Sequence, residues 1–208
     1  IEAVTRGLGE DWDIVTGMAL KLIPGVHEMH AVAEAAIAAA KTGNVAPEEV
    51  EEITVAGSPH LEGCMLHLHP RDYAGAIHSL PYYMAACVVD KEFSWGHVSM
   101  EKVTDPTIGR LQDKVKLEIV PGRSVADYPY GGTVTIRTRG GKEYAHTVDW
   151  PKGSAQRGIE WSDVDAKYRA LLPSSHLPEE RIERSLQILH ELDTISDISQ
   201  LTATLAGD

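Results

Sequence analysis

The sequence has few of the residues that mark several large classes of protein. Its 208 residues include two cysteines, Cys64 and Cys87, which lie far apart beside apolar neighbours. A disulfide framework needs more, so these two are predicted to be reduced core thiols of a cytoplasmic protein. No apolar run approaches the roughly 20 residues that a membrane-spanning helix needs, and the N-terminus has no basic segment followed by an apolar one. We therefore expect no membrane partner.

Positive charge is scarce as well. Lys and Arg number 19 against 31 Asp and Glu, which gives a formal net charge of −12. Such a surface repels nucleic acid, so we expect no nucleic-acid partner. The hydrophobic content of 43% suits a globular protein with a core. The sequence begins at Ile1 without a lead-in turn, and we expect it to be a piece of a longer chain.

Hydrophobic periodicity predicts an α+β fold. Apolar positions at helical spacing predict a helix over about residues 27–42, and alternation around Ile53 and Val55 predicts a short strand. "GCMLHLH" is expected to be extended, and Ser79 with Pro81 should begin the next helix. Thr104 and Pro106 should begin a short one. Alternation predicts strands within residues 114–120, 133–138 and 143–150, the last two joined through residues 139–142.

We expect two parts. Residues 1–153 should form a small, mainly antiparallel sheet with helices. Residues 154–208 should form a C-terminal helical segment, in which Ser162 and Asp165 cap one helix, Pro178 opens another and Ile195 to Leu205 form the last.

The stretch "KLIPGVHEMH" is the first candidate for chemistry. Pro24 and Gly25 break the chain ahead of a helix, so Lys21 should lie on a loop, with His27 and His30 on one side of the first helical turns. A helix N-terminus beside a lysine favours an anion, and a carboxylate is the natural ligand. The alternative is that Lys21 is solvated and both histidines are ordinary surface or half-buried residues.

Two other interpretations involve a metal. His27, His30 and Glu34 share a stripe of the predicted helix, and Cys64, His67 and His69 would place both histidines on one face of a strand. The first set has a lysine beside it, and the second lacks further ligands. We therefore predict no metal site.

"HSLPYYMAAC" is the second candidate stretch, with His78, Ser79 and Tyr82 at a helix start. No phosphate loop, dinucleotide fingerprint or nucleophile elbow is found, because the required glycine spacings do not follow a strand.

The order of these pieces resembles the C-terminal half of the MmgE/PrpD family, whose members include 2-methylcitrate dehydratase, cis-aconitate decarboxylase and iminodisuccinate epimerase. The resemblance rests on a K-x-x-P stretch before an alanine-rich helix, then "EEITV", "HSLPYYMAA", "DPTIGRLQDKVKLEI", a hairpin with "GG", and "DAKYRALL". It implies that residues 16–153 form a lid-like α/β domain. The C-terminal helices would pack on a large helical domain that is not in this sequence.

The resemblance also implies site residues. Lys21 and His30 match the lysine and histidine of the K-x-x-P…H motif, and Tyr82 matches the tyrosine of an S-x-x-Y motif, so these three are the predicted catalytic residues. His27 stands where many members carry a basic residue, and it is the predicted substrate-binding residue together with His78 and Ser79. Leu22, Ile23 and Val26 depart from commoner residues, which leaves the substrate open.

The resemblance implies a lyase-type reaction without a cofactor on a small di- or tricarboxylate, with dehydration of a 2-methylcitrate-like acid as the leading case. Epimerisation or decarboxylation of a related acid, such as iminodisuccinate or cis-aconitate, is the alternative, because all three reactions share an enediolate intermediate. A noncatalytic subunit that kept the lid fold is a further alternative. The expected partners are the carboxylate substrate and the absent helical domain or subunit, in a homo- or hetero-oligomer.

Overall fold

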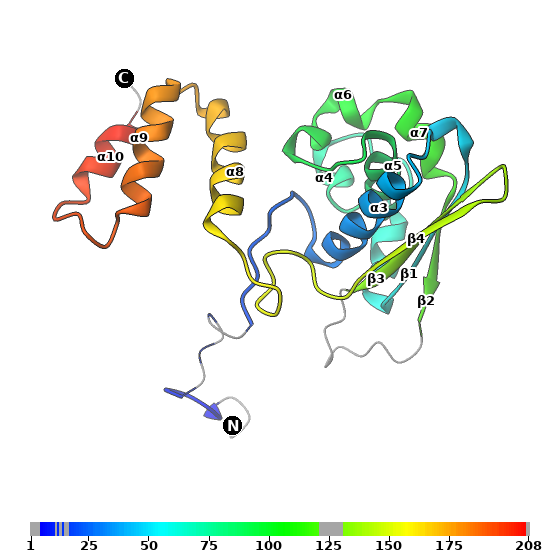
Figure 1. Ribbon diagram of the computed structural model, residues 1–208, viewed down its shortest axis with the longest axis horizontal. Coiled ribbons are helices and arrows are strands. Elements are labelled where there is room, and N and C mark those ends of the chain that lie inside the picture. The colour runs from blue at the N-terminus through cyan, green and yellow to red at the C-terminus, as the bar shows by residue number, and fades with distance from the viewer. Residues whose placement is uncertain (1–4, 11, 13, 15–16, 121–130, 207–208) are drawn as a thin grey trace. The chain divides into compact units, whose positions relative to one another are not determined.

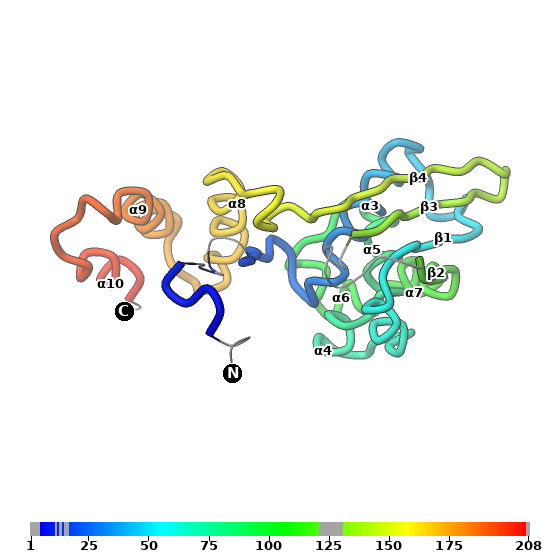
Figure 2. The backbone as a smooth tube through the Cα atoms, turned by 90° about the horizontal axis from the view of Figure 1, so that it is seen from below, coloured from blue at the N-terminus to red at the C-terminus, as the bar shows by residue number. Residues whose placement is uncertain are grey.

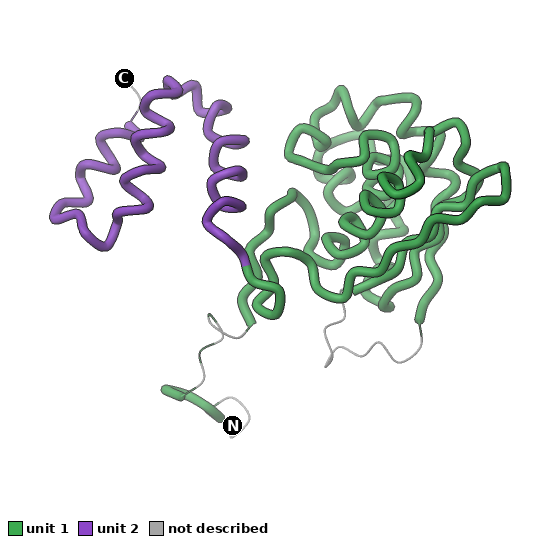
Figure 3. The backbone as a smooth tube through the Cα atoms, in the orientation of Figure 1, with its two compact units in different colours: residues 1–158 green, residues 159–208 purple. Residues whose placement is uncertain are grey.

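The computed structural model describes residues 5–10, 12, 14, 17–120 and 131–206, and the chain divides into two compact units, residues 1–158 and 159–208 (Figure 3). The predicted α+β class is confirmed. The assignment of these parts as a lid-like domain and as helices that pack on an absent domain stays a prediction.

The helices and strands of the first unit are η1 (His27–Met29), α3 (His30–Thr42), η2 (Pro47–Glu49), β1 (Val50–Gly57), η3 (Pro59–Leu66), α4 (Tyr73–Ala76), α5 (Leu80–Asp90), η4 (Trp95–Val98), α6 (Met100–Val103), α7 (Pro106–Gln112), β2 (Val115–Ile119), β3 (Gly132–Thr138) and β4 (Glu143–Val148).

The first unit contains a four-stranded sheet in the order β2-β1-β3-β4 (Figure 1). β1 pairs with β3, and β3 with β4, in antiparallel fashion, whereas β1 and β2 are parallel. The sheet is therefore mixed, with two antiparallel pairs and one parallel pair. The predicted hairpin between β3 and β4 is present, and Gly141 adopts a φ of +76° in its turn, where the absence of a Cβ removes the steric penalty.

Helices cover one face of this sheet. Along β3 the buried residues alternate with half-buried ones, as expected when one face packs on helices and the other meets solvent. α3 packs against β3 and β4, and α5 packs against α3 (Figure 2). A Cβ on Gly132 of β3 would lie 2.5 Å from Val32 Cγ1, so the glycine permits the close approach of α3. The start of α3, which carries His30, is thereby fixed against the sheet.

Several helix starts follow local sequence signals, and α5 is the clearest. Ser79 Oγ accepts a hydrogen bond from the Tyr82 amide at 3.1 Å, and Pro81 lies in the first turn, as predicted. At α7, however, the cap is Asp105 rather than Thr104, since Asp105 Oδ1 accepts from the amides of Thr107 and Ile108. The prediction was wrong by one residue there, because a carboxylate adjacent to Pro106 reaches two amides at once.

One predicted extended segment is wrong. "GCMLHLH" does not form a strand, because residues 59–66 form the 3₁₀ helix η3, which Pro59 opens. Leu61 and Cys64, three residues apart, are the buried positions of this helix, so the two side chains that enter the core follow helical spacing. His67 and His69 come after its end and are exposed.

The second unit is helical, with α8 (Trp161–Leu171), η6 (Leu172–Ser175), α9 (Glu179–His190) and α10 (Ser199–Leu205). α8 begins two residues before the predicted position: Glu160 and Asp163 form the capping box, in place of Ser162 and Asp165. α10 begins at Ser199, so Ile195 precedes it. Arg181 of α9 donates to the carbonyls of Ala203 and Thr204 and so joins α9 to the end of α10.

Across the described parts of both units, none of the helices combines the length and the apolar character that crossing a bilayer requires.

Candidate functional site

The turn that precedes α3 is fixed by a hydroxyl group from α5. Tyr83 Oη donates a hydrogen bond to the carbonyl of Pro24, which lies 59 residues away in the sequence. Gly25 follows with a φ of +98°, and a Cβ at this position would overlap the Tyr83 hydroxyl and approach the Ile77 carbonyl oxygen to 3.0 Å. Gly25 therefore meets two requirements at once, a left-handed backbone and space for Tyr83.

Backbone hydrogen bonds hold the two ends of the same turn. The Leu20 amide donates to the Gly153 carbonyl at 2.8 Å, and the Val26 amide donates to the Ile77 carbonyl at 3.2 Å. The chain between these anchors carries Lys21, so its path is defined although the Lys21 side chain is exposed. Residues 20–26 are called the anchored turn below.

The anchored turn and the two helices that follow it carry three of the predicted site residues. Lys21 Nζ donates to the Gly25 carbonyl at 2.9 Å, which folds the lysine side chain back over the turn. The rings of His27 and His30 meet edge to face with centroids 5.0 Å apart. His30 is 3% exposed, whereas His27 is half-buried. His27 is therefore the histidine of this pair that solvent or a ligand can reach more readily.

Burial lowers the pKa of His27 below its ordinary value of 6.5, and the positive charge of Lys21 lowers it further, while Glu28 acts in the opposite direction. The His27 imidazole is therefore uncharged at neutral pH, and an uncharged imidazole can accept a proton. An acceptor of this kind beside an ammonium group is suited to take a proton from a carbon next to a carboxylate.

The expected contribution of the helix N-terminus is smaller than the sequence suggests. α3 is preceded by the 3₁₀ turn η1, in which the Met29 amide donates to the Val26 carbonyl and the His30 amide to the His27 carbonyl. These two amides are committed to the turn rather than to a ligand. Positive charge for a carboxylate would therefore come mainly from Lys21.

The two alternative metal sets are not assembled. Glu34 is engaged elsewhere, because its carboxylate accepts hydrogen bonds from Arg157 and from the Lys152 amide. The set of Cys64, His67 and His69 fails because its strand is absent, and His69 instead pairs with Asp113 at 2.8 Å. Within the described ranges no three His, Cys, Asp or Glu side chains are grouped so as to hold a metal ion.

His78 and Ser79 lie at the junction between α4 and α5, next to the Ile77 carbonyl that anchors the turn. His78 is exposed, and its Nδ1 is 2.7 Å from the Ala74 carbonyl oxygen. The Ser79 hydroxyl is buried, donates to the His67 carbonyl and caps α5. Ser79 therefore has a structural role here, and its predicted contact with substrate stays a prediction.

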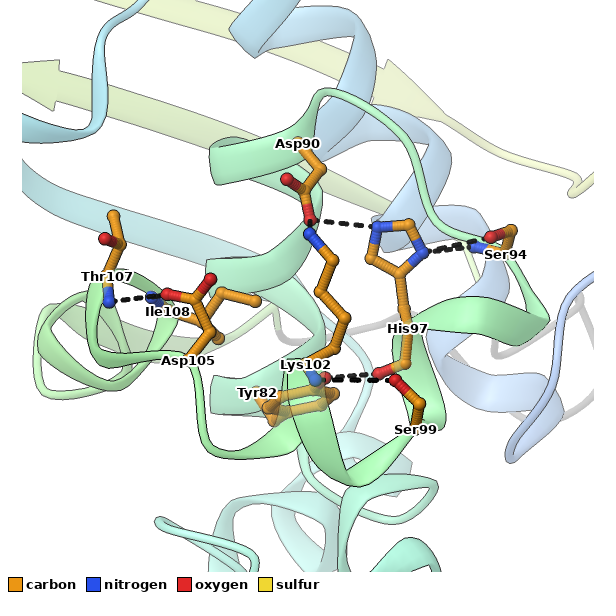
Figure 4. Close-up of polar contacts among 9 residues, drawn as sticks. All are labelled: Tyr82, Asp90, Ser94, His97, Ser99, Lys102, Asp105, Thr107 and Ile108. Atoms are coloured by element: carbon orange, nitrogen blue, oxygen red, sulfur yellow. Dashed lines mark hydrogen bonds and ion pairs between the residues drawn. The ribbon is translucent and has the colours of Figure 1, made fainter.

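Tyr82 does not join the anchored turn. It is fully buried, and its hydroxyl donates to the His97 carbonyl (Figure 4). Burial, and then the charges of Asp90 and Asp105, raise the pKa of Tyr82 well above its ordinary value, so the hydroxyl stays protonated and remains available as a donor. Its neighbour Tyr83, which is not among the predicted site residues, is the tyrosine that contacts the turn.

The partner of Tyr82 belongs to a partly buried polar network that sequence reasoning missed (Figure 4). His97 Nδ1 accepts from the Ser94 amide at 2.9 Å, so the proton of the neutral ring lies on Nε2, which is 3.1 Å from Asp90 Oδ2. The same carboxylate oxygen accepts from Lys102 at 2.7 Å. Because its acceptor nitrogen is used by a backbone amide, His97 holds the η4 segment in place. The spacing of Ser94 and His97 as a capping box was the available signal.

Comparison with known proteins identifies one family. Residues 24–194 match the family described as MmgE/PrpD C-terminal domain, which confirms the resemblance inferred from the sequence. Members of that family are generally enzymes, and the family is consistent with dehydratase or lyase-type activity. No curated protein matches the chain.

Proposed function

The chain belongs to the MmgE/PrpD family, and on this premise we propose that it forms part of a lyase-type enzyme that removes a proton next to a carboxylate of a small di- or tricarboxylate. Dehydration of a 2-methylcitrate-like hydroxy acid is the reaction we favour. The observation that carries the proposal is the anchored turn, where Lys21 and His27 are close enough for the lysine charge to lower the pKa of the histidine.

The chemistry follows from the charges. Removing a proton beside a carboxylate creates an enediolate with a second negative charge, and the barrier falls when a cation and hydrogen-bond donors are already in place. Lys21 supplies the cation. An imidazole of the pair His27 and His30 supplies the base, and neutral His27 is in the correct state to accept a proton at pH 7. This set of side chains needs no cofactor, and we propose none.

Within this proposal His30 keeps the catalytic role that the family motif implies, and His27 binds substrate or shares the proton transfer. His30 is buried and His27 is half-buried, so the two rings can be tested separately. We expect both His27→Gln and His30→Gln to fold, and their kinetic constants distinguish the roles. The variant of the true base should lose kcat, whereas the variant of a substrate-binding ring should raise KM with a smaller change in kcat.

Proton NMR of candidate acids tests the reaction class. Incubation in D2O distinguishes loss of water, loss of carbon dioxide and exchange at the α carbon without net change. The proposal expects water loss from a hydroxy acid such as 2-methylcitrate. Exchange alone would favour epimerisation, and loss of carbon dioxide from cis-aconitate would favour decarboxylation. No change in any acid, with the complete enzyme present, would contradict all three.

We also propose that a helical domain or subunit completes the site, as the family resemblance implies. A noncatalytic subunit that retains the fold is the competing candidate, and it is favoured by the burial of Tyr82 away from the anchored turn. Co-purification of a helical partner together with activity would support the enzyme. A complex that forms but turns over none of the acids would support the noncatalytic subunit.

A further inference from the structure

A second group of cations lies at the end of the sheet where α7 and the β3–β4 hairpin meet. A cavity of about 450 Å³ is lined there by Arg110 of α7, Lys114 after α7 and Arg139 of the hairpin turn, together with Pro47, Glu48, Leu111 and Asp113. This volume lies within the range of small-molecule sites, roughly 300 to 1,000 Å³. The three cations come from separate parts of the first unit and converge on one space.

Some other cations of the first unit are neutralised by carboxylates. Nearby Lys116 and Arg137 are both paired with Glu52, and Arg157 is paired with Glu34. Among the described residues, by contrast, Arg110, Lys114 and Arg139 have no ion pair with a carboxylate. In a chain of net charge −12, these three cations outnumber the two carboxylates, Glu48 and Asp113, that line the same cavity.

Hydrogen bonds hold the Lys114 side chain and the backbone of Arg139 in place. Lys114 Nζ donates to the Val50 carbonyl at 2.5 Å, and the Arg139 amide donates to the Glu49 carbonyl at 2.8 Å. Burial lowers the pKa of Lys114, and the charges of Arg139 and Arg110 lower it further. The C-terminal end of α7 carries a partial negative charge, which stabilises the positive charges of Arg110 and Lys114. Arg139 lies on a hairpin and receives no such stabilisation. An anion in the cavity would relieve the repulsion among all three.

We propose that Arg110, Lys114 and Arg139 form a binding site for a compact polyanion whose charge lies on oxygen atoms, either a phosphate ester or a polycarboxylate. Guanidinium groups bind both in a bidentate manner, and Lys114 adds a point charge. The carboxylates of Glu48 and Asp113 in the same lining disfavour a ligand that engages only one of the cations. The site is separate from the anchored turn and does not depend on the proposed function.

Isothermal titration of the full chain at low salt tests the site, with inorganic phosphate and citrate as the two probes and sodium chloride at equal ionic strength as the reference. Arg139→Gln and Lys114→Gln should each weaken binding by about tenfold or more. Arg137→Gln is the matched control, because Arg137 is two residues away and already paired with glutamate. Binding of either probe that Lys21→Ala abolishes and Arg139→Gln leaves unchanged would belong to the anchored turn instead and would overturn the proposal.

Saturable binding of phosphate with weak citrate binding would assign a phosphate ester, and the reverse would assign a polycarboxylate. The proposal is overturned if neither probe binds saturably, or if Arg139→Gln binds as wild type does. It is also overturned if Arg137→Gln weakens binding as much as Arg139→Gln. Melting temperatures of the variants establish that each is folded, and Arg139→Gln, at an exposed position, carries the test if Lys114→Gln is unstable.

Discussion

Burial and then the charge of Lys21 act on His27, so the protonation of His27 contributes to both stability and chemistry. The pKa of His27 in the folded chain lies below its ordinary value of 6.5. As pH falls through 6.5 the unfolded state therefore binds more protons than the folded state, and the free energy of unfolding decreases until the folded pKa is passed.

We predict that His27→Gln reduces this loss of stability between neutral and mildly acidic pH. The measurement is urea unfolding at a series of pH values. His146→Gln, which changes an exposed histidine of β4, is the matched control and should retain the wild-type pH dependence. An identical pH dependence in His27→Gln would show that the pKa of His27 is not lowered.

The two adjacent tyrosines offer a second test at this scale. Both are buried, and both donate to a backbone carbonyl, Tyr82 to His97 and Tyr83 to Pro24. Tyr82→Phe and Tyr83→Phe should each cost about 1 to 3 kcal/mol, because a buried acceptor loses its partner. Tyr83→Phe alone should move the imidazole titration of His27 in NMR, since it alone releases the anchored turn. Equal effects of the two variants on His27 would contradict this assignment.

Among the elements, the anchored turn and the hairpin turn each contain a glycine with positive φ, and they differ in surroundings. No heavy atom lies within 4 Å of a Cβ built on Gly141, whereas one built on Gly25 would overlap Tyr83. Gly141→Ala should cost about 1 kcal/mol for its backbone conformation alone. Gly25→Ala should cost about 3 kcal/mol or more, because overpacking adds to the same strain.

Chemical denaturation of both variants measures the difference, and the double variant Gly25→Ala with Tyr83→Phe measures the coupling between the two positions. The double variant should be more stable than the sum of the two single changes predicts. Strict additivity would show that Gly25 and Tyr83 do not interact.

Elements specified by local signals were predictable from the sequence. The Ser79 cap, the alternation of β3 and the hairpin glycine each depend on residues within a few positions of one another. η3 was not predictable from local signals. Its helical form becomes evident only from the burial of Leu61 and Cys64, three residues apart, in the core. In the candidate site, too, the local features were predictable and the long-range contact was not. Lys21, His27 and His30 are close in sequence, whereas the contact from Tyr83 to Pro24 spans 59 residues, and periodicity carries no information about it.

At the scale of the whole molecule, the family resemblance implies a cleft with two walls. In the second unit Trp161, Leu192 and Ile198 are 57%, 44% and 55% exposed, which leaves apolar surface available for contact. We predict that the 208-residue chain alone is inactive and either self-associates or binds a helical partner, with activity only in the second case. Sedimentation of the chain, alone and with a candidate partner, measures this. An active, well-behaved monomer would contradict it.

The central claim is that the anchored turn carries the chemistry of the complete enzyme, and Lys21→Ala tests it most directly. Lys21 is exposed, so its removal should leave the melting temperature nearly unchanged. Loss of one preorganised cation should lower kcat/KM by about 10²- to 10³-fold. Lys41→Ala, at the exposed far end of α3, is the matched control and should retain wild-type turnover. Steady-state turnover of the carboxylate substrate is the measurement: a fall confined to Lys21→Ala is the predicted result, and full activity in that variant would contradict the account.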